Sequence, residues 1–161
     1  MSLAIRRARP DEAGLVLSLI RELAAYEKLL HEVEATEASI GAALFNDNPR
    51  LFCEIAEWDG EPAGFALWFF NFPTFSGRSG LYLEDLFVRP AFRGKGIGKA
   101  LLSHLARTGI EKGCSRLQWS VLDWNTPSIE FYKSLGAEMM DEWTVCRVGG
   151  QALTALAQGG R

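Results

Sequence analysis

The chain has 161 residues, of which 48% are hydrophobic, and its 17 basic and 20 acidic side chains give a net charge of −3. We expect a single domain over residues 1–161, because this length and hydrophobic content suffice for one core. The acidic balance argues against a nucleic-acid-binding protein, which usually carries a basic stripe, and the sequence has no run of about 18 apolar residues that would span a membrane.

The first half of the chain predicts a strand, two helices and a hairpin. The signals are runs of apolar and β-branched residues for strands, and apolar residues at helical spacing for helices. In chain order we expect a strand at 3–8, a helix at 11–29, a helix at 36–45, and strands 51–58 and 63–72 joined by the turn Asp59-Gly60.

The second half of the chain alternates strands and helices. In chain order we expect a strand at 81–88, a glycine-rich loop, a helix to about Lys112, a strand at 115–122, a helix from Thr126-Pro127 that stops before Gly136, and a strand at 142–148. We expect the tail, 154–161, to fray. This order favours an α+β fold, similar to an α/β sandwich, in which helices cover both faces of a mixed sheet.

The segment "RGKGIGKA", residues 93–100, has three glycines at every second position where a helix should begin. Each glycine costs the helix about 1 kcal/mol relative to alanine, so the backbone must need the space. The spacing fits neither a P-loop nor a dinucleotide fingerprint. The pattern that the segment does contain is R-x-x-G-x-G, formed by Arg93, Gly96 and Gly98. Glycines let a phosphate approach the free N–H groups of a helix start, and Arg93 with Lys95 or Lys99 can add charge. A plain tight turn is the alternative.

A second strand-to-helix junction, "LDWNTPSIEFYKSLGAE" at 122–138, places Asn125, Ser128 and Tyr132 around a helix start. Together the two junctions resemble the GNAT family of acetyltransferases, in which R-x-x-G-x-G is the pyrophosphate loop for acetyl-coenzyme A. "ELAAYEKL" and "LYLEDLFV" extend the resemblance to the diamine (spermidine/spermine-type) acetyltransferases, over about residues 4 to 148. It implies the GNAT fold, with a mostly antiparallel, twisted sheet.

The resemblance implies that acetyl-coenzyme A is the cosubstrate. No metal is implied, because His31 and His104 stand alone and neither has a metal-type partner spacing. The backbone of the strand before the loop would pair with the pantetheine arm. The implied cofactor residues are Leu86, Val88, Arg93, Gly94, Gly96, Gly98, Lys99, Asn125 and Ser128. Tyr132 would be the acid that protonates the leaving thiolate; an aromatic residue that packs in an amphipathic helix is the alternative.

The implied acceptor site is acidic. Glu84 and Asp85 are adjacent on an expected strand and would point to opposite faces, and burying such a pair without partners is costly. By resemblance, Glu84 relays the amine's proton through water and Asp85 helps to hold the cation; a solvent-facing pair is the alternative. Tyr26 and Glu27 match a helix-end pair that contacts the amine in the subfamily, or form a solvated helix tip.

The loop before "LYLED" departs from the polyamine-type relatives, which carry an aspartate and a tryptophan there. Here Pro73 and Phe75 take those positions, and Arg78 is added. Phe75 is thus the substrate-binding residue of this loop, and a polycation loses one anchoring charge. We expect a shorter amine, or an amine that also carries a carboxylate, such as thialysine.

The sequence therefore predicts an enzyme that transfers an acetyl group from acetyl-coenzyme A to the primary amine of a small molecule by direct attack, with Tyr132 as general acid and Glu84 as water-relayed base. A catalytically weak regulatory module that binds acetyl-coenzyme A is the alternative. The resemblance also implies a homodimer. The acidic balance and the lack of a long apolar run lead us to expect neither nucleic acid nor membrane as partner. Three cysteines without a CxxC pair, and no signal-like N-terminus, favour a reduced, cytoplasmic location.

Overall fold

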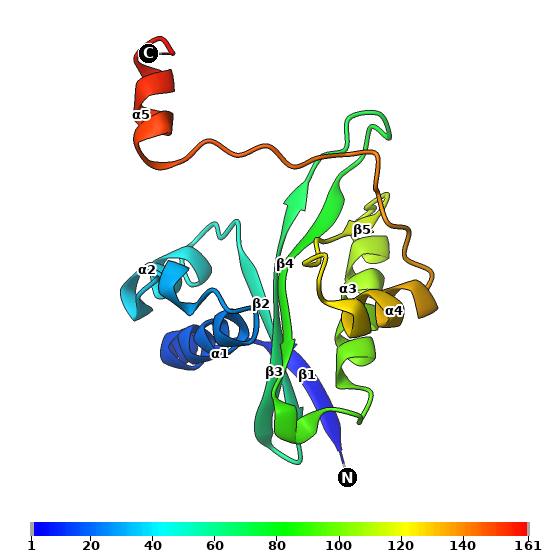
Figure 1. Cartoon of the computed structure of the whole chain (residues 1–161). Coiled ribbons are helices and arrows are strands. Elements are labelled where there is room, and N and C mark those ends of the chain that lie inside the picture. Colours follow the sequence, from blue (N-terminus) through cyan, green and yellow to red (C-terminus); the bar gives the residue numbers. More distant parts are fainter. Residues whose placement is uncertain (1, 161) are drawn as a thin grey trace. The chain divides into compact units, whose positions relative to one another are not determined.

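The computed structural model describes residues 2–160, which form two compact units, one ending at Leu122 and one beginning at Asp123 (Figure 1). In chain order, the first unit contains β1 (Leu3–Arg7), the 3-10 turn η1 (Pro10–Glu12), α1 (Ala13–Tyr26), η2 (Leu30–Glu32), α2 (Glu37–Leu44), β2 (Phe52–Trp58), β3 (Glu61–Asn71), β4 (Gly80–Val88), η3 (Pro90–Phe92), α3 (Ile97–Glu111) and β5 (Leu117–Gln118). The second unit contains α4 (Thr126–Ser134) and α5 (Gly150–Ala157).

The five strands of the first unit form one sheet in the order β1-β2-β3-β4-β5. All neighbouring strands are antiparallel except β4 and β5, which are parallel. Helices α1 and α2 cover one face of the sheet and α3 covers the other (Figure 1). The predicted α+β class, with a mixed and mostly antiparallel sheet between helices, is confirmed.

Each face of the sheet buries an apolar layer. From α1, Val16, Leu19 and Leu23 point to the sheet at helical spacing and are buried together with Phe65 and Leu67 of β3. The buried large residues of α3 on the opposite face are Ile97, Leu101, Leu102 and Leu105. Because both ends of the loop between β4 and α3 are fixed in this way, the loop has a defined place at one end of the sheet.

Two predicted strands are corrected by the structure. Residues 142–148 are exposed and form no strand within the described chain, and of 115–122 only Leu117–Gln118 pairs with β4. Both stretches have strand-like residues, but a strand also needs a neighbour that accepts and donates its hydrogen bonds. The tail also differs from the expectation of fraying, because α5 extends to Ala157.

The helix boundaries follow local signals. The predicted helix at 11–29 begins with the η1 turn and ends earlier, at Tyr26; Lys28 has a φ of 62°, a left-handed conformation that ends a helix. Thr36 caps α2, because its side chain accepts the N–H of Ser39. Within residues 2–160, no helix combines the length and apolar character that crossing a membrane would require.

Candidate active site

The glycine-rich loop uses glycine where the backbone requires it. Gly94 and Gly96 have φ values of 77° and 80°, in the left-handed region that other residues avoid. Gly96 is the N-cap of α3 and offers no side chain to the first N–H groups of that helix. Gly98 and the exposed Lys99 follow in its first turn. A helix start with free N–H groups and a nearby lysine favours an anion.

Next to this loop, β4 has an edge that no strand covers. β5 pairs with only two residues near the start of β4, so among the described residues no strand pairs with 83–88 on that side. The N–H of Arg89 donates to the carbonyl of Ala63 in β3 at 2.8 Å. Because hydrogen-bond directions alternate along a strand, the N–H and C=O groups of Leu86 and Val88 point to the uncovered edge.

A β-bulge determines where the acidic pair lies. Leu67 of β3 faces Asp85 and Trp68 faces Leu83, so Glu84 is an extra residue on β4. Cross-strand partners share a face of the sheet, so Asp85 lies with Leu67 on the side of α1, whereas Glu84 is exposed. We predicted opposite faces of the sheet for Glu84 and Asp85 from the regular alternation of side chains along a strand. The bulge interrupts that alternation at this pair.

Two other carboxylates act on Asp85 through their charge: the adjacent Glu84, and Glu27, which follows α1. Burial, and then the negative charges of Glu84 and Glu27, raise the pKa of Asp85 to about 7. Burial also raises the pKa of Glu27. A cation bound here would offset the repulsion between the carboxylates, so the cluster suits an ammonium group.

Contacts between distant residues hold the end of α1 beside the loop. Arg89, directly after β4, pairs with Glu22 of α1, with 2.8 Å between Nη2 and Oε2, and also donates from Nη1 to the carbonyl of Pro62 at 3.0 Å. Arg93 of the loop lies over the ring of Tyr26, with its Cζ 5.0 Å from the ring centroid. Sequence reasoning missed Arg89 and Glu22, because 67 residues separate them and no local pattern links them.

The predicted specificity residues lie in the loop between β3 and β4. Phe75 is fully exposed and Arg78 is also exposed. The hydroxyl of Ser76 donates to the carbonyl of Pro73 and lies 2.8 Å from the hydroxyl of Ser115, which folds the loop back on the unit. Arg78 forms no ion pair within residues 2–160, so its charge is available to a ligand.

The second unit carries the remaining predicted residues on one helix. Asn125 is the N-cap of α4 and is buried, and Pro127 lies in the first turn, where its missing N–H costs nothing. Ser128 is half-buried, and Tyr132 is buried, with its ring 5.5 Å from that of Phe131. The spacing of Asn125, Ser128 and Tyr132 places them along one side of the helix start.

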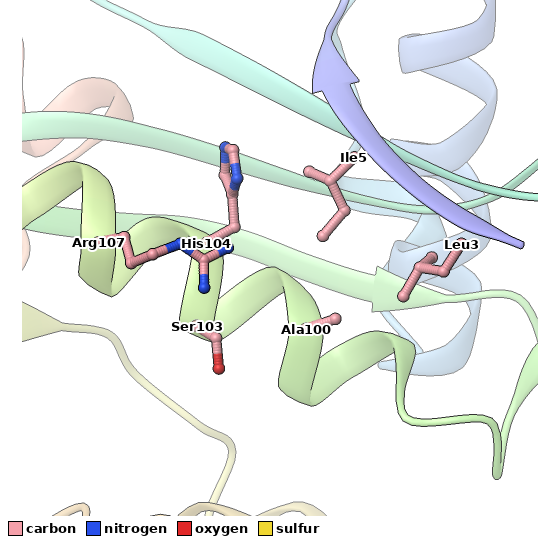
Figure 2. A pocket seen from close by; sticks show the side chains of 6 residues that line it. All are labelled: Leu3, Ile5, Ala100, Ser103, His104 and Arg107. Atoms are coloured by element: carbon pink, nitrogen blue, oxygen red, sulfur yellow. The ribbon is translucent and has the colours of Figure 1, made fainter.

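A different groove, with a volume of about 450 Å³, lies where α3 faces β1 (Figure 2). Its lining residues are Leu3, Ile5, Ala100, Ser103, His104 and Arg107. Nε2 of His104 lies 3.9 Å from Oε2 of Glu54, a buried carboxylate that also pairs with Arg7 at 3.0 Å. None of the predicted site residues lines this groove, so it is not the candidate active site.

Known proteins resemble this chain over nearly its full length. The sequence profile of the acetyltransferase (GNAT) family matches residues 16–137. Thialysine N-epsilon-acetyltransferase of Sus scrofa is 40% identical, over 97% of this chain and 98% of its own length. L-ornithine N5-acetyltransferase of Arabidopsis thaliana is 32% identical, over 94% of this chain and 86% of its own. The solved structure of an integron cassette protein from the V. cholerae mobile metagenome has a TM-score of 0.82 and 31% identity, covering 99% of both chains.

Proposed function

Because the chain belongs to the GNAT family of acetyltransferases, it is an N-acetyltransferase, and we propose that it acetylates the terminal primary amine of a small, thialysine-like molecule with acetyl-coenzyme A. The observation that carries the proposal is the cluster of Glu27, Glu84 and Asp85 beside the glycine loop. The cluster supplies negative charge for an ammonium group, and the loop supplies N–H groups for a pyrophosphate. A diamine or a polyamine is the broader acceptor class.

For the cofactor, we assign the pyrophosphate to the glycine loop. The start of α3 supports this assignment, since no side chain caps its first N–H groups, Gly94 and Gly96 adopt the positive φ that the turn requires, and Lys99 adds a positive charge. The uncovered edge supports pairing of Leu86 and of the Val88 N–H with the amide groups of the pantetheine arm, in the way that a peptide adds to a strand, whereas the carbonyl of Val88 already accepts from Nε of Arg93. In the second unit, we assign Asn125 and Ser128 to the same cofactor.

For the chemistry, the acceptor nitrogen must lose a proton, because a lysine-like amine has a pKa of about 10.4 and is charged at neutral pH. We assign this proton to Glu84, through water, and the holding of the ammonium group to Asp85. The neutral nitrogen then bonds to the thioester carbonyl carbon, and the bond between that carbon and sulfur breaks. As the amide forms, the nitrogen gives up a second proton to solvent. We assign Tyr132 as the acid that protonates the thiolate, since a phenol with pKa near about 10 carries its proton at neutral pH.

For the acceptor, two observations support an amine that carries a carboxylate. Arg78 adds a positive charge to the loop between β3 and β4, with Phe75 nearby in place of a carboxylate. The two relatives described above are named for thialysine and L-ornithine, both amino acids with a terminal amine. A second ammonium group, as in a polyamine, would find no anion in this loop.

We further propose that the protein acts in the reducing cytoplasm as a homodimer. Its three cysteines are free, which suits that compartment. Trp143 and Val145 are 75% and 82% exposed, and apolar side chains of this kind gather at protein interfaces. Light scattering of the wild type and of Trp143→Ser would test the dimer.

The decisive experiment is release of free coenzyme A with a panel of thialysine, lysine, putrescine and spermidine. We expect thialysine to have the highest kcat/KM. If the protein binds coenzyme A but turns over none of these amines, the alternative of a weakly catalytic binding module is favoured. If spermidine is the best substrate, the role that we assign to Arg78 is wrong.

A further inference from the structure

We propose that the side chain of Arg93 is a positioning residue, which holds the Tyr26 end of α1 against the glycine loop, and that it is not a ligand of the pyrophosphate. This inference rests on the proposed acetyl transfer, because it assigns the glycine loop to the cofactor and the end of α1 to the amine. It concerns residues of the first unit only.

Three contacts hold the guanidinium group of Arg93 in place, one through its Nε–H and two through its planar face. Its Nε donates a 2.9 Å hydrogen bond to the carbonyl oxygen of Val88. Its Cζ lies 5.0 Å from the centroid of the Tyr26 ring and 5.5 Å from that of Phe87. A planar guanidinium stacks well on aromatic faces, and the hydrogen bond to β4 fixes its direction. Arg93 therefore connects the last residue of α1 to the end of β4.

The loop has other groups for a pyrophosphate. The first N–H groups of α3 are not capped by a side chain. Of the two nearby lysines, Lys95 lies with its Nζ 5.2 Å from the Trp58 ring centroid. Lys99 is exposed and has neither an ion pair nor a ring contact among the described residues. The backbone together with Lys99 thus provides both the donors and the charge, without the side chain of Arg93.

The position of Tyr26 matters because Glu27 follows it directly. Glu27 is near enough to Asp85 for its charge to raise the pKa of that carboxyl. The ion pair of Arg89 with Glu22 holds the preceding turn of α1, so loss of the Arg93 contact would loosen the helix from Tyr26 onward and shift Glu27 within the carboxylate cluster. Amine binding should therefore suffer, while the phosphate contacts of the loop stay as they are.

The test compares Arg93→Gln, which removes the charged plane, with Tyr26→Leu, which removes the ring. We expect Arg93→Gln to raise KM for thialysine about three- to tenfold, the scale of one or two cation–π contacts. The calorimetric Kd of coenzyme A should change less than about twofold. In the Tyr26→Leu background, Arg93→Gln should raise KM no further, because the two residues act as one unit.

Hydrogen exchange of residues 22–30 gives a readout that needs no turnover. We expect faster exchange in Arg93→Gln and Tyr26→Leu. Tyr26→Phe keeps the ring, so its exchange should be closer to that of the wild type than the exchange of Tyr26→Leu. Arg93→Lys, with the charge but not the plane, should be intermediate, and it replaces Arg93→Gln if that variant does not fold. Lys99→Ala is the matched phosphate variant and should weaken coenzyme A binding without changing this exchange.

The proposal is wrong if Arg93→Gln weakens coenzyme A binding about tenfold or more while exchange over 22–30 stays as in the wild type. That result would make the side chain a pyrophosphate ligand. Additive effects of Arg93→Gln and Tyr26→Leu on KM would also overturn it. Absence of amine acetylation by the wild type would refute the proposed function instead, and the exchange and calorimetric results would still decide the role of Arg93.

Discussion

Replacing Asp85 by asparagine should stabilise the fold at high pH and weaken catalysis at the same pH. The pKa of Asp85 is raised from 3.8 to about 7. Between these values the folded state binds more protons than the unfolded state, so the free energy of unfolding falls as pH rises from about 4 to about 7. At about 1.4 kcal/mol per pKa unit, the upper limit is about 4 kcal/mol. Because the side chain is only half-buried, we expect about 2 kcal/mol.

Urea unfolding at about pH 5 and about pH 8 measures this effect. Asp85→Asn should exceed the wild type in stability by about 2 kcal/mol at the higher pH, and by less at the lower pH. Asp47→Asn is the matched control, because Asp47 is exposed in a loop, and its difference from the wild type should not change with pH. If the difference for Asp85→Asn is also independent of pH, the carboxylate is solvated and the reasoning fails.

The same pair of proteins tests the role of Asp85 in amine binding. A charge-assisted hydrogen bond to a bound group is worth about 1.5 to 3 kcal/mol, so Asp85→Asn should lower kcat/KM for thialysine at least about tenfold where Asp85 is ionised. The ratio of wild type to variant should rise as pH increases through about 7. Ionisation of the amine itself cancels in this ratio. A constant ratio would show that Asp85 does not face the substrate.

Three further substitutions test the other assignments. Gly96→Val should weaken coenzyme A binding about 30-fold, or about 2 kcal/mol. The control is Gly60→Val, at a similar φ of 84° in the hairpin between β2 and β3, which should leave the affinity for coenzyme A within about twofold of the wild type. Equal losses of affinity in the two variants would refute the phosphate role of Gly96. Tyr132→Phe should lower kcat about 100-fold with the Kd of coenzyme A unchanged, and full turnover would mean that another group protonates the thiolate. Arg78→Ala should reduce the preference for thialysine over putrescine about three- to fivefold, the scale of one exposed charge, and an unchanged ratio would remove Arg78 from the specificity argument.

The segment from β4 to α3 was predicted almost residue by residue, because its signals are local. The strand expected at 81–88 corresponds to β4, which begins one residue earlier, at Gly80. The apolar spacing that begins at Ile97 marks the start of α3. We expected the backbone conformation to require glycine at 94 and 96, and both residues have positive φ. The strand that we predicted at 142–148 was wrong because strand formation is not a local property. The composition of this segment favours a strand, but a strand also needs a neighbouring strand, which the local sequence does not specify.

Local sequence patterns could not predict the contacts that assemble the candidate site. Arg89 meets Glu22, and Arg93 meets Tyr26, only because α1 lies across the sheet with its last turn beside the end of β4. Each of these residues is ordinary in its own segment: an arginine after a strand, an acid in a helix. A local pattern predicts which face of an element is apolar, but the pairing of polar side chains depends on how the elements pack.

The bulge in β4 shows most directly how the fold determines the chemistry of the site. In a regular strand, Asp85 would share a face with Leu81 and Leu83, and Leu81 lies next to Gly109 of α3. The extra residue reverses this order, so that Asp85 and Phe87 lie on the side of α1. The carboxyl group is thereby placed near Glu27, and burial with this second charge raises its pKa. The sequence of β4 is compatible with either arrangement, and pairing with β3 selects the one in which the acids meet.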